Sequence, residues 1–202
     1  MKALQILIVL AVGYLLGSVL PALIIGKMLN GVDIRKYGSG NPGTTNVLRT
    51  MGIGPAILVF TIDVLKGVVA TLFAKIVMPD DVVLGVTLAG FAVICGHNWP
   101  LYFGFRGGKA VATSIGVALV ATPVITLIVI ALALIVLVIK RYMSLTSIVG
   151  SILYFLVILI FAREYWFLAL IIMVVIIIRH RENIKRLLNG TERKIGERVK
   201  LQ

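Results

Sequence analysis

Long runs of hydrophobic residues alternate with short polar segments along this chain. The runs cover roughly residues 3–28, 53–78, 82–96, 111–139, 145–162 and 165–178. A helix needs about 20 apolar residues to cross the hydrocarbon core of a bilayer, and most of these runs are near that length. The pattern predicts an all-α fold, a multi-pass integral membrane helix bundle that forms a single domain over residues 1–202.

The run from 111 to 139 is the ambiguous one. Its 29 residues would make about 43 Å of helix, which is too long for one ordinary crossing and short for two. Two basic pairs flank it, at 106/109 and at 140/141, and both lie on the cytoplasmic side only if the run crosses twice. We expect the turn between Ala121 and Pro123, because proline disfavours a continuous helix. A single kinked span, which would leave six crossings, is the alternative.

Two crossings by this run give seven transmembrane helices, with the N-terminus outside and the C-terminus in the cytoplasm. Sixteen of the 20 Lys and Arg residues then face the cytoplasm, as the positive-inside rule requires. The same rule, together with attraction to anionic lipid headgroups, accounts for much of the net charge of +12. We therefore expect contact with membrane lipids and no nucleic-acid partner.

Composition supports the membrane assignment, since 60% of the residues are hydrophobic and 14% are charged, against about a quarter charged in soluble domains. The first apolar run far exceeds the about 7 to 15 residues of a signal-peptide core, so it is interpreted as a retained span. The single cysteine, Cys95, has no partner within the chain for a disulfide and is interpreted as a small core side chain.

The most unusual polar segment is YGSGNPGTTNVLRTMG, residues 37–52. Its glycines match the G-x-G-x-x-G pattern, but a membrane helix precedes them where the dinucleotide motif needs a strand. The spacing also fits a P-loop, yet Thr44 stands where that motif needs lysine. Glycines let several backbone N–H groups face one concavity, and Arg49 can grip phosphate through two hydrogen bonds. The segment predicts a phosphate pocket, and a flexible cytoplasmic turn is the alternative.

A second cytoplasmic segment, GHNWPLYFGFRGGKAVATSIG at 96–116, has similar features. Gly107, Gly108 and Lys109 come directly before an apolar helix, whose N-terminus offers free N–H groups and a partial positive charge. Two such loops on one face favour phosphate binding more strongly than either loop alone.

Further polar residues could complete a site. Ser144 lies in KRYMSLTS where a span re-enters, and His180 and Asn183 share a helical face in RHRENIKRLLNG. Asp63 and Lys66 fall near the middle of the second span. Their charges suit either a functional site or a mutual ion pair that fixes helix packing, and both interpretations stay open.

Taken together, these segments resemble the bacterial acyl-phosphate:glycerol-3-phosphate acyltransferases, the PlsY family. GSGNPGTTNVLRTMG, DVLKG, GHNWPLYFGFRGGKAVATSIG, KRYMSLTS and RHRENIKRLLNG occur in the family's order and spacing. The resemblance implies transfer of a fatty acyl group from acyl phosphate to the sn-1 hydroxyl of glycerol 3-phosphate, giving lysophosphatidic acid and phosphate, the first step of phospholipid biosynthesis. It also implies seven helices in the bacterial inner membrane, a site on the cytoplasmic face, no metal or other cofactor, and possible contact with the enzyme that produces acyl phosphate.

The resemblance also assigns roles to individual residues. The expected acyl-phosphate site comprises Ser39, Gly40, Thr45, Asn46 and Gly108, and the expected glycerol-3-phosphate site comprises Arg49, Lys109, Ser144, His180 and Asn183. The expected catalytic residues are Ser39, Lys109, His180 and Asn183. Either a substrate phosphate oxygen or His180 receives the proton of the attacking hydroxyl.

The chain departs from the family at one of these loops. Where relatives often read FKGGKG, this chain has Arg106 and Ala110. Arg106 keeps the positive charge, but Ala110 replaces a glycine beside the proposed lysine, so less conformational freedom is expected in the loop there.

Two other classes of function are compatible with the pattern. A membrane transporter of a phosphorylated metabolite would also need basic residues and phosphate pockets. The basic segments lie on one face, however, and no inverted repeat or pair of broken helices is evident. A non-catalytic membrane subunit is the third interpretation.

Overall fold

The computed structural model describes residues 1–199, and within them the fold is entirely helical. The α-helices are α1 (Lys2–Ser18), α2 (Pro21–Asn30), α3 (Thr44–Met51), α4 (Ile53–Val77), α5 (Val82–Asn98), α6 (Val111–Ala121), α7 (Pro123–Lys140), α8 (Met143–Phe161), α9 (Trp166–Arg179) and α10 (Arg181–Leu188). Short 3-10 turns occur at η1 (Ile34–Lys36), η2 (Pro79–Asp81), η3 (Leu101–Phe103) and η4 (Arg163–Tyr165).

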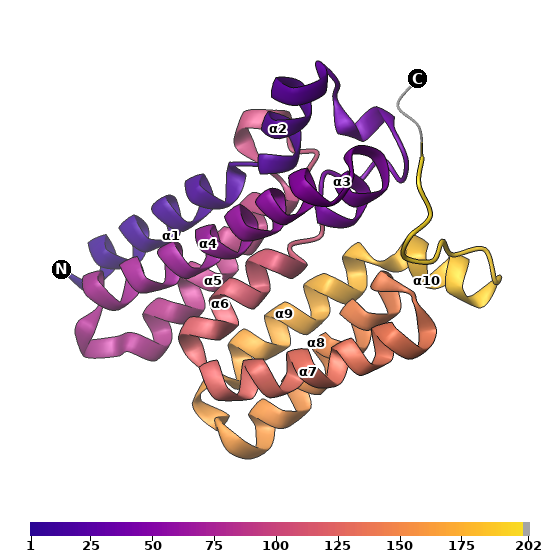
Figure 1. The fold of residues 1–202 in the computed structure, drawn as a ribbon. Coiled ribbons are helices and arrows are strands. Elements are labelled where there is room, and N and C mark those ends of the chain that lie inside the picture. Colours follow the sequence, from indigo (N-terminus) through magenta and orange to yellow (C-terminus); the bar gives the residue numbers. More distant parts are fainter. Residues whose placement is uncertain (200–202) are drawn as a thin grey trace.

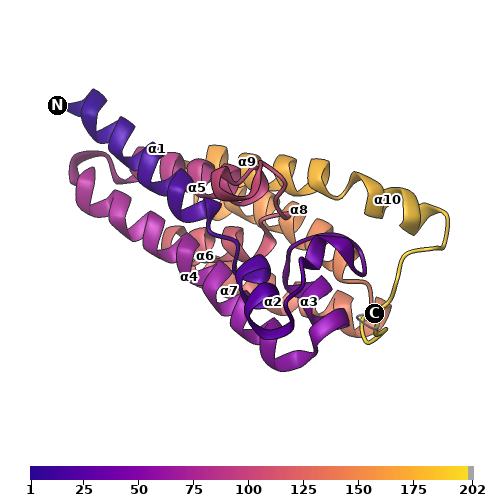
Figure 2. The same ribbon diagram turned by 90° about the horizontal axis from the view of Figure 1, so that it is seen from above.

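The longer helices lie side by side, and the short helices α2, α3 and α10 gather at one end of the bundle (Figures 1 and 2). α1 packs mainly on α5, α4 packs on both α5 and α6, and α8 packs between α7 and α9. The N-terminus lies at the opposite end, where the Lys2 ammonium is 2.9 Å from the Asp81 carboxylate. The loops with the motifs predicted to bind phosphate also lie at the end opposite the N-terminus.

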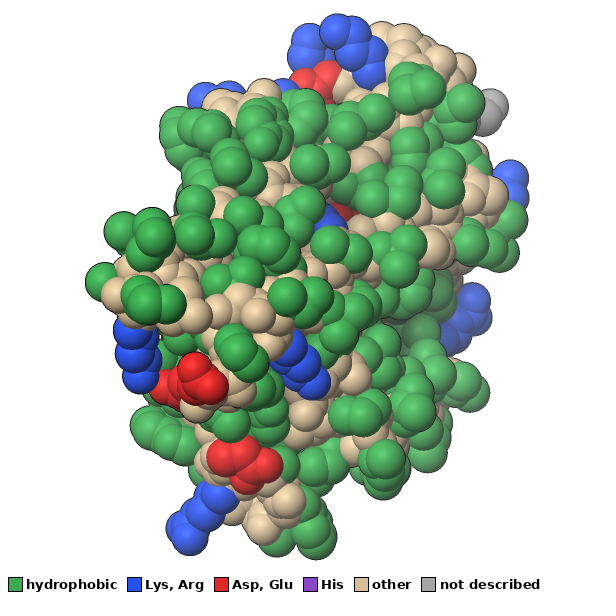
Figure 3. Space-filling model, turned by 90° about the vertical axis from the view of Figure 1, so that its left-hand side faces the viewer, with side chains coloured by type: hydrophobic (Ala, Val, Ile, Leu, Met, Phe, Trp, Pro, Cys, Tyr) green, Lys and Arg blue, Asp and Glu red, His purple; other side chains and the backbone are tan. Residues whose placement is uncertain are grey.

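The bundle presents an apolar surface suited to lipid. Within residues 1–199, five helical segments are long and apolar enough to cross a membrane, namely Lys2–Asn30, Ile53–Val77, Pro79–Phe103, Pro123–Lys140 and Met143–Phe161. α6 and α9 are shorter, with 11 and 14 residues. Hydrophobic side chains cover most of the face in Figure 3, and large ones such as Ile57, Leu65 and Ile76 on α4 are exposed. The predicted multi-pass helical membrane fold agrees with this architecture.

The long apolar run from 111 to 139 is divided where the sequence predicted. Thr122 separates α6 from α7, and its backbone (φ −144°, ψ 71°) leaves the helical region immediately before Pro123. The prediction of a turn between Ala121 and Pro123 is confirmed, and α7 doubles back beside α8 rather than continuing α6 (Figure 1).

The first apolar run was expected as one span over 3–28, and it forms one candidate span over Lys2–Asn30 whose helix is broken inside it. α1 ends at Ser18 and α2 begins at Pro21, so the helix is interrupted between them. Pro21 has no N–H to donate and disfavours helical geometry at Leu20. The ammonium of Lys66 compensates by donating to the carbonyls of Gly17 (3.1 Å) and Val19 (2.8 Å).

Close packing of α4 on α6 positions the two loops relative to each other. A Cβ at Gly67 would collide with the backbone carbonyl of Thr113, and one at Gly116 with that of Val64. The two helices therefore approach backbone to backbone, as small residues permit in membrane bundles. Because α3 leads into α4 and the 104–110 loop leads into α6, this contact brings both motifs to one cavity.

Candidate active site

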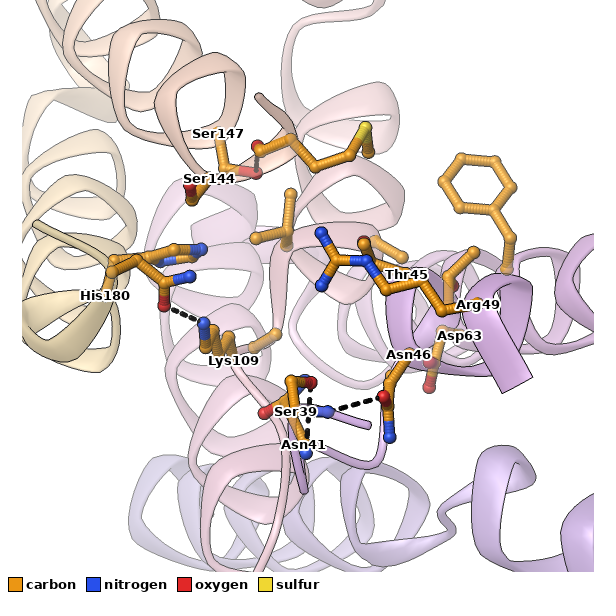
Figure 4. Close-up of a pocket in the computed structure, with 18 of the residues that line it drawn as sticks. Ser39, Asn41, Thr45, Asn46, Arg49, Asp63, Lys109, Ser144, Ser147 and His180 are labelled. Atoms are coloured by element: carbon orange, nitrogen blue, oxygen red, sulfur yellow. Dashed lines mark hydrogen bonds between the residues drawn. The ribbon is translucent and has the colours of Figure 1, made fainter. Parts of the chain in front are cut away.

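A polar cavity of about 140 Å³ lies at the end of the bundle where the loops gather. It is lined by Ser39, Asn41, Gly43, Thr44, Thr45, Asn46, Arg49, Phe60, Asp63, His97, Lys109, Ala110, Val111, Ala112, Met143, Ser144, Ser147, His180, Asn183 and Glu192. In Figure 4, Arg49 approaches from α3 while Lys109 and His180 approach from the other side. The fold thus brings together side chains from both loops and from the ends of α8 and α9.

The glycine-rich loop is shaped by the side chain of Asn46. Its Oδ1 accepts a hydrogen bond from the backbone N–H of Ser39 (2.9 Å), and its Nδ2 donates to the carbonyls of Ile34 (3.1 Å) and Tyr37 (3.0 Å). Gly38 has a φ of +62°, and a Cβ there would collide with Asn46 Oδ1. Asn46 is 1% exposed, so its polar atoms are occupied in holding the loop rather than free for a ligand.

Two elements hold the second loop. The N–H groups of Gly107 and Gly108 donate to the carbonyls of Asn98 (3.2 Å) and His97 (3.0 Å). The guanidinium of Arg179 donates to the carbonyl of Gly107 (3.1 Å) and, more closely, to that of Gly108 (2.7 Å). The loop is therefore anchored to both α5 and α9 immediately before Lys109.

Ala110 stands where the loop enters α6, with φ 58° and ψ 17°. This left-handed conformation is the one that glycine adopts without a steric penalty. The departure from FKGGKG noted above therefore falls on a position whose backbone favours glycine, yet the loop keeps its shape with alanine and directs Lys109 into the cavity.

The Lys109 ammonium donates a hydrogen bond to the side-chain carbonyl of Asn183 on α10. Burial, only partly offset by the nearby Glu192 carboxylate, lowers the pKa of Lys109 to about 8. The amine is therefore still mostly protonated at neutral pH. A partly desolvated cation of this kind interacts strongly with an anion that enters the cavity.

His180 lies between α9 and α10, and its Nδ1 is 2.8 Å from the carbonyl of Ile176. Burial, and then the positive charge of Lys109, lowers the pKa of His180 to about 4. The ring is thus neutral at pH 7, with its Nδ1–H donated to that carbonyl and Nε2 left as a hydrogen-bond acceptor. His180 can accept a bond from a hydroxyl, but with this pKa it is a weak base.

Arg49 adds a second cation to the cavity. One terminal nitrogen donates to the carbonyl of Arg193 (3.0 Å), while its buried Nε has no partner within the described residues. Burial lowers the pKa of Arg49, but a guanidinium stays protonated at neutral pH. The hydroxyl of Thr44 is likewise buried without a partner among residues 1–199. Both groups are available to donate to a ligand.

Glu192 is the principal site residue that the sequence did not predict. Its carboxylate accepts hydrogen bonds from Ser144 (2.7 Å), Asn183 (2.6 Å) and Arg186 (2.7 Å). Burial raises the pKa of Glu192, but these three bonds outweigh burial and hold the pKa below its ordinary value. Its only signal is that it is one of three glutamates within a strongly basic C-terminal segment. Asn41 and Ser147 also line the cavity without having been predicted.

Asp63, Lys66 and His97 form a buried cluster beside the cavity. The Lys66 ammonium is 2.8 Å from Asp63 Oδ1 and 2.8 Å from His97 Nδ1. Lys66 also donates to the carbonyls at the break between α1 and α2. The ion pair of Asp63 and Lys66 therefore contributes to helix packing, which was one of its two interpretations. Asp63 and His97 nevertheless reach the cavity wall.

Two predicted site residues do not line the cavity. Gly40 has a φ of +72° and serves as a turn in the first loop. Gly108 lies against the His97 ring, where an added Cβ would collide with Nε2. The other predicted residues all line it, namely Ser39, Thr45, Asn46, Arg49, Lys109, Ser144, His180 and Asn183.

A second cavity, of about 230 Å³, lies beside the first, between α6, α7, α8 and α9. Phe60, Val111, Met143 and Ser147 line both cavities. Nearly all of the other side chains around the second cavity are apolar or small, so the polar site adjoins an apolar groove.

The fold and the site define a helical membrane protein in which a polar cavity containing Arg49 and Lys109 adjoins an apolar groove. A family model described as glycerol-3-phosphate acyltransferase matches residues 7–190. The glycerol-3-phosphate acyltransferase of Thermoanaerobacter sp. (strain X514) is 45% identical over 193 residues, which cover 95% of this chain and 96% of that protein. The one from Clostridioides difficile (strain 630) is 46% identical over 204 residues, covering 98% and 99%. The chain therefore belongs to the glycerol-3-phosphate acyltransferase family.

Solved structures agree with this assignment. The glycerol 3-phosphate form of PlsY, an integral membrane glycerol 3-phosphate acyltransferase, superposes with a TM-score of 0.89 at 41% identity. The lysophosphatidic acid form of PlsY superposes with a TM-score of 0.86 at 40% identity. Each match covers 95% of this chain and 96% of the PlsY chain.

Proposed function

We propose that this protein transfers a fatty acyl group from acyl phosphate to the sn-1 hydroxyl of glycerol 3-phosphate, forming lysophosphatidic acid and phosphate. The observation that carries this proposal is that the polar cavity containing Arg49 and Lys109 adjoins the apolar groove and shares four lining residues with it. Both substrates carry phosphate, and one also carries a long apolar chain. A site that joins these two environments fits both substrates and the lipid product.

The two phosphate groups are assigned to different parts of the cavity. The glycine-rich loop, with Ser39, Thr45 and the buried hydroxyl of Thr44, receives the phosphate of acyl phosphate, and Asn46 holds that loop in shape. Gly40 and Gly108 contribute as backbone turns beside this site. Glycerol 3-phosphate is bound by the opposite group, consisting of Arg49, Lys109, Ser144, His180 and Asn183.

The reaction needs no enzymic nucleophile, because acyl phosphate is already activated. The glycerol hydroxyl oxygen attacks the acyl carbon, the bond from that carbon to the phosphate oxygen breaks, and phosphate leaves with the electron pair. The hydroxyl proton passes to a phosphate oxygen of the substrate. Lys109 and the loop N–H groups stabilise the negative charge that develops, and the cavity holds the two reactants in line.

The alternative proton acceptor is His180. Its pKa of about 4 makes it a poor general base at neutral pH. Its Nε2 is better suited to accept a hydrogen bond that orients the hydroxyl. We therefore assign His180 to binding and orientation.

In the membrane, we place seven crossings, with α1 and α2 forming the first and the short α6 and α9 each crossing once. Helices of this length are accommodated by tilting or local thinning of the bilayer. The N-terminus then lies outside, and the cavity lies at the cytoplasmic face of a bacterial inner membrane. Acyl phosphate would reach it from the enzyme that produces it, by direct contact or through the lipid.

The test uses the purified protein in detergent with synthetic acyl phosphate and labelled glycerol 3-phosphate. The proposal predicts labelled lysophosphatidic acid in a one-to-one ratio with released phosphate, and no phosphate release without glycerol 3-phosphate. Folded protein that forms no lysophosphatidic acid would refute it. Uptake of glycerol 3-phosphate into protein-containing liposomes without an acyl donor would instead support a transporter.

A further inference from the structure

The lining of the apolar groove stops at Tyr154 on α8, at Thr126 on α7 and at Ala118 on α6. Its α8 wall is built from small residues at helical spacing, Ser147, Gly150 and Ser151. A Cβ at Gly150 would lie 3.3 Å from the Cβ of Ala133 on α7, so the two helices are already close there. The small side chains leave a furrow on the α8 wall of the groove, and residues of α6, α7 and α9 line its other sides.

One turn beyond Ser151, the furrow meets the ring of Tyr154. This side chain is 5% exposed, and its hydroxyl is 2.9 Å from the hydroxyl of Thr122. Thr122 is itself fixed, since it is the residue at which α6 ends and α7 begins. Tyr154 is thus held at both ends, by its backbone on α8 and by its hydroxyl on the α6–α7 turn. A buried, hydrogen-bonded tyrosine does not swing aside without leaving its hydroxyl unpaired.

The length of the furrow follows from the helix that forms its wall. Tyr154 lies ten positions beyond Ser144 on α8, which corresponds to about 15 Å of helix. A zig-zag alkyl chain advances about 1.3 Å per carbon, given a C–C bond of about 1.5 Å. The furrow therefore takes about 12 carbons in extended form before the chain meets the tyrosine ring.

We propose that Tyr154, held by Thr122, sets the acyl-chain length that this protein accepts. The inference rests on the proposed acyl-phosphate donor, whose chain is placed in the groove because the groove adjoins the site that receives the acyl phosphate and shares four lining residues with it. Chains near lauroyl fill the furrow, and the ends of longer chains are forced against Tyr154 or out toward the exposed Leu134. Tyr154 is a specificity-determining residue, remote from the reacting atoms.

The experiment compares lauroyl phosphate with palmitoyl phosphate as donors, at saturating glycerol 3-phosphate, by the ratio of their kcat/KM values. Tyr154→Ala lengthens the furrow, and Ser151→Leu fills it one turn earlier. Phe161→Ala is the matched control, because Phe161 lies on α8 outside the groove and is 74% exposed. Lauroyl phosphate and palmitoyl phosphate differ in how they disperse in detergent. This difference is the same for every variant, so it cancels when the ratio of kcat/KM values is compared between variants.

The palmitoyl-to-lauroyl ratio is expected to rise about tenfold in Tyr154→Ala and to fall about tenfold in Ser151→Leu, the scale by which apolar pockets discriminate chain length. Phe161→Ala should leave the ratio unchanged. An unchanged ratio in both groove variants, or an equal loss at both chain lengths in both, would overturn the inference. Absence of acyl transfer by the wild type with either donor would instead refute the proposed function.

Discussion

The Lys109 ammonium donates a hydrogen bond to the side-chain carbonyl of Asn183, which lies 74 positions further along the chain. Asn183 in turn donates to Glu192 (2.6 Å), and Glu192 accepts from Ser144 (2.7 Å). The loop before α6, the start of α8, α10 and the C-terminal segment are therefore joined around one cation. This network fixes the position of the Lys109 ammonium in the cavity.

The pH dependence should reveal the buried ammonium. Because burial lowers the pKa of Lys109 to about 8, the required charge is present below that pH and is lost above it. The phosphate of glycerol 3-phosphate loses its second proton near pH 6. We therefore expect kcat/KM to fall as the pH drops below about 6, which is the acidic limb of the profile. We expect kcat/KM for glycerol 3-phosphate to be highest between the two limbs, which a pH profile from 5 to 10 measures.

Glu192 offers a matched control for that profile. Its negative charge raises the pKa of Lys109, so Glu192→Gln should move the alkaline limb to lower pH. An alkaline limb near the ordinary lysine value of about 10.4, or one that does not move in the variant, would contradict this assignment.

His180→Ala separates the two roles considered for the histidine. A binding role predicts that KM for glycerol 3-phosphate rises about tenfold while kcat changes less than tenfold. Steady-state kinetics with glycerol 3-phosphate varied at fixed acyl phosphate measure both. A fall in kcat of about 10² or more with an unchanged KM would make His180 the general base.

Lys66→Met should strongly destabilise the protein. It removes the nearest cation from the buried Asp63 carboxylate, which keeps only the His97 ring at 3.3 Å, and it removes the donor to the carbonyls of Gly17 and Val19. Losing one partner of a buried pair costs about 3–5 kcal/mol, or a fall in Tm of roughly 10 °C. Thermal unfolding in detergent checks this. Lys75→Met is the control, since Lys75 is only partly buried and binds a single carbonyl, that of Val120. Equal effects of the two substitutions would show that the cluster has no special role.

Ala110 allows a test of the backbone conformation before α6. Ala110→Gly should change the free energy of unfolding by less than about 1 kcal/mol, because relief of left-handed strain offsets the greater freedom of the unfolded chain. Ala110→Val should lower it by about 2 kcal/mol or more, since a β-branched residue tolerates a φ of 58° poorly. Activity should survive the first substitution. Comparable stability of the valine variant would contradict the left-handed geometry.

Much of the fold was predictable because membrane helices carry a strong hydrophobic signal. Pro123 marked the turn between α6 and α7 correctly. Pro21 marks the interruption after α1 in the same way, but the apolar run continues past it and hid the break. The need for that break is visible only in three dimensions, where Lys66 satisfies the freed carbonyls.

The site was predictable where chemistry is concentrated in motifs and less so elsewhere. Ser39, Arg49 and Lys109 stood out because glycine-rich loops with polar or basic residues are rare between apolar runs. Glu192 did not, because three glutamates are scattered along the basic C-terminal segment and no local pattern distinguishes this one. The end of the groove lining at Tyr154 was equally invisible, since the shape of an apolar groove depends on packing between helices rather than on residue type.

Phosphate release by wild type and Lys109→Ala tests the central claim most directly. Purified protein in detergent is given synthetic acyl phosphate, with and without glycerol 3-phosphate, and thermal unfolding confirms that the variant is folded. The account predicts release that requires glycerol 3-phosphate and that falls by about 10² or more in the variant, because the cation that stabilises the developing charge is gone. Release by folded Lys109→Ala within a fewfold of the wild type would contradict it.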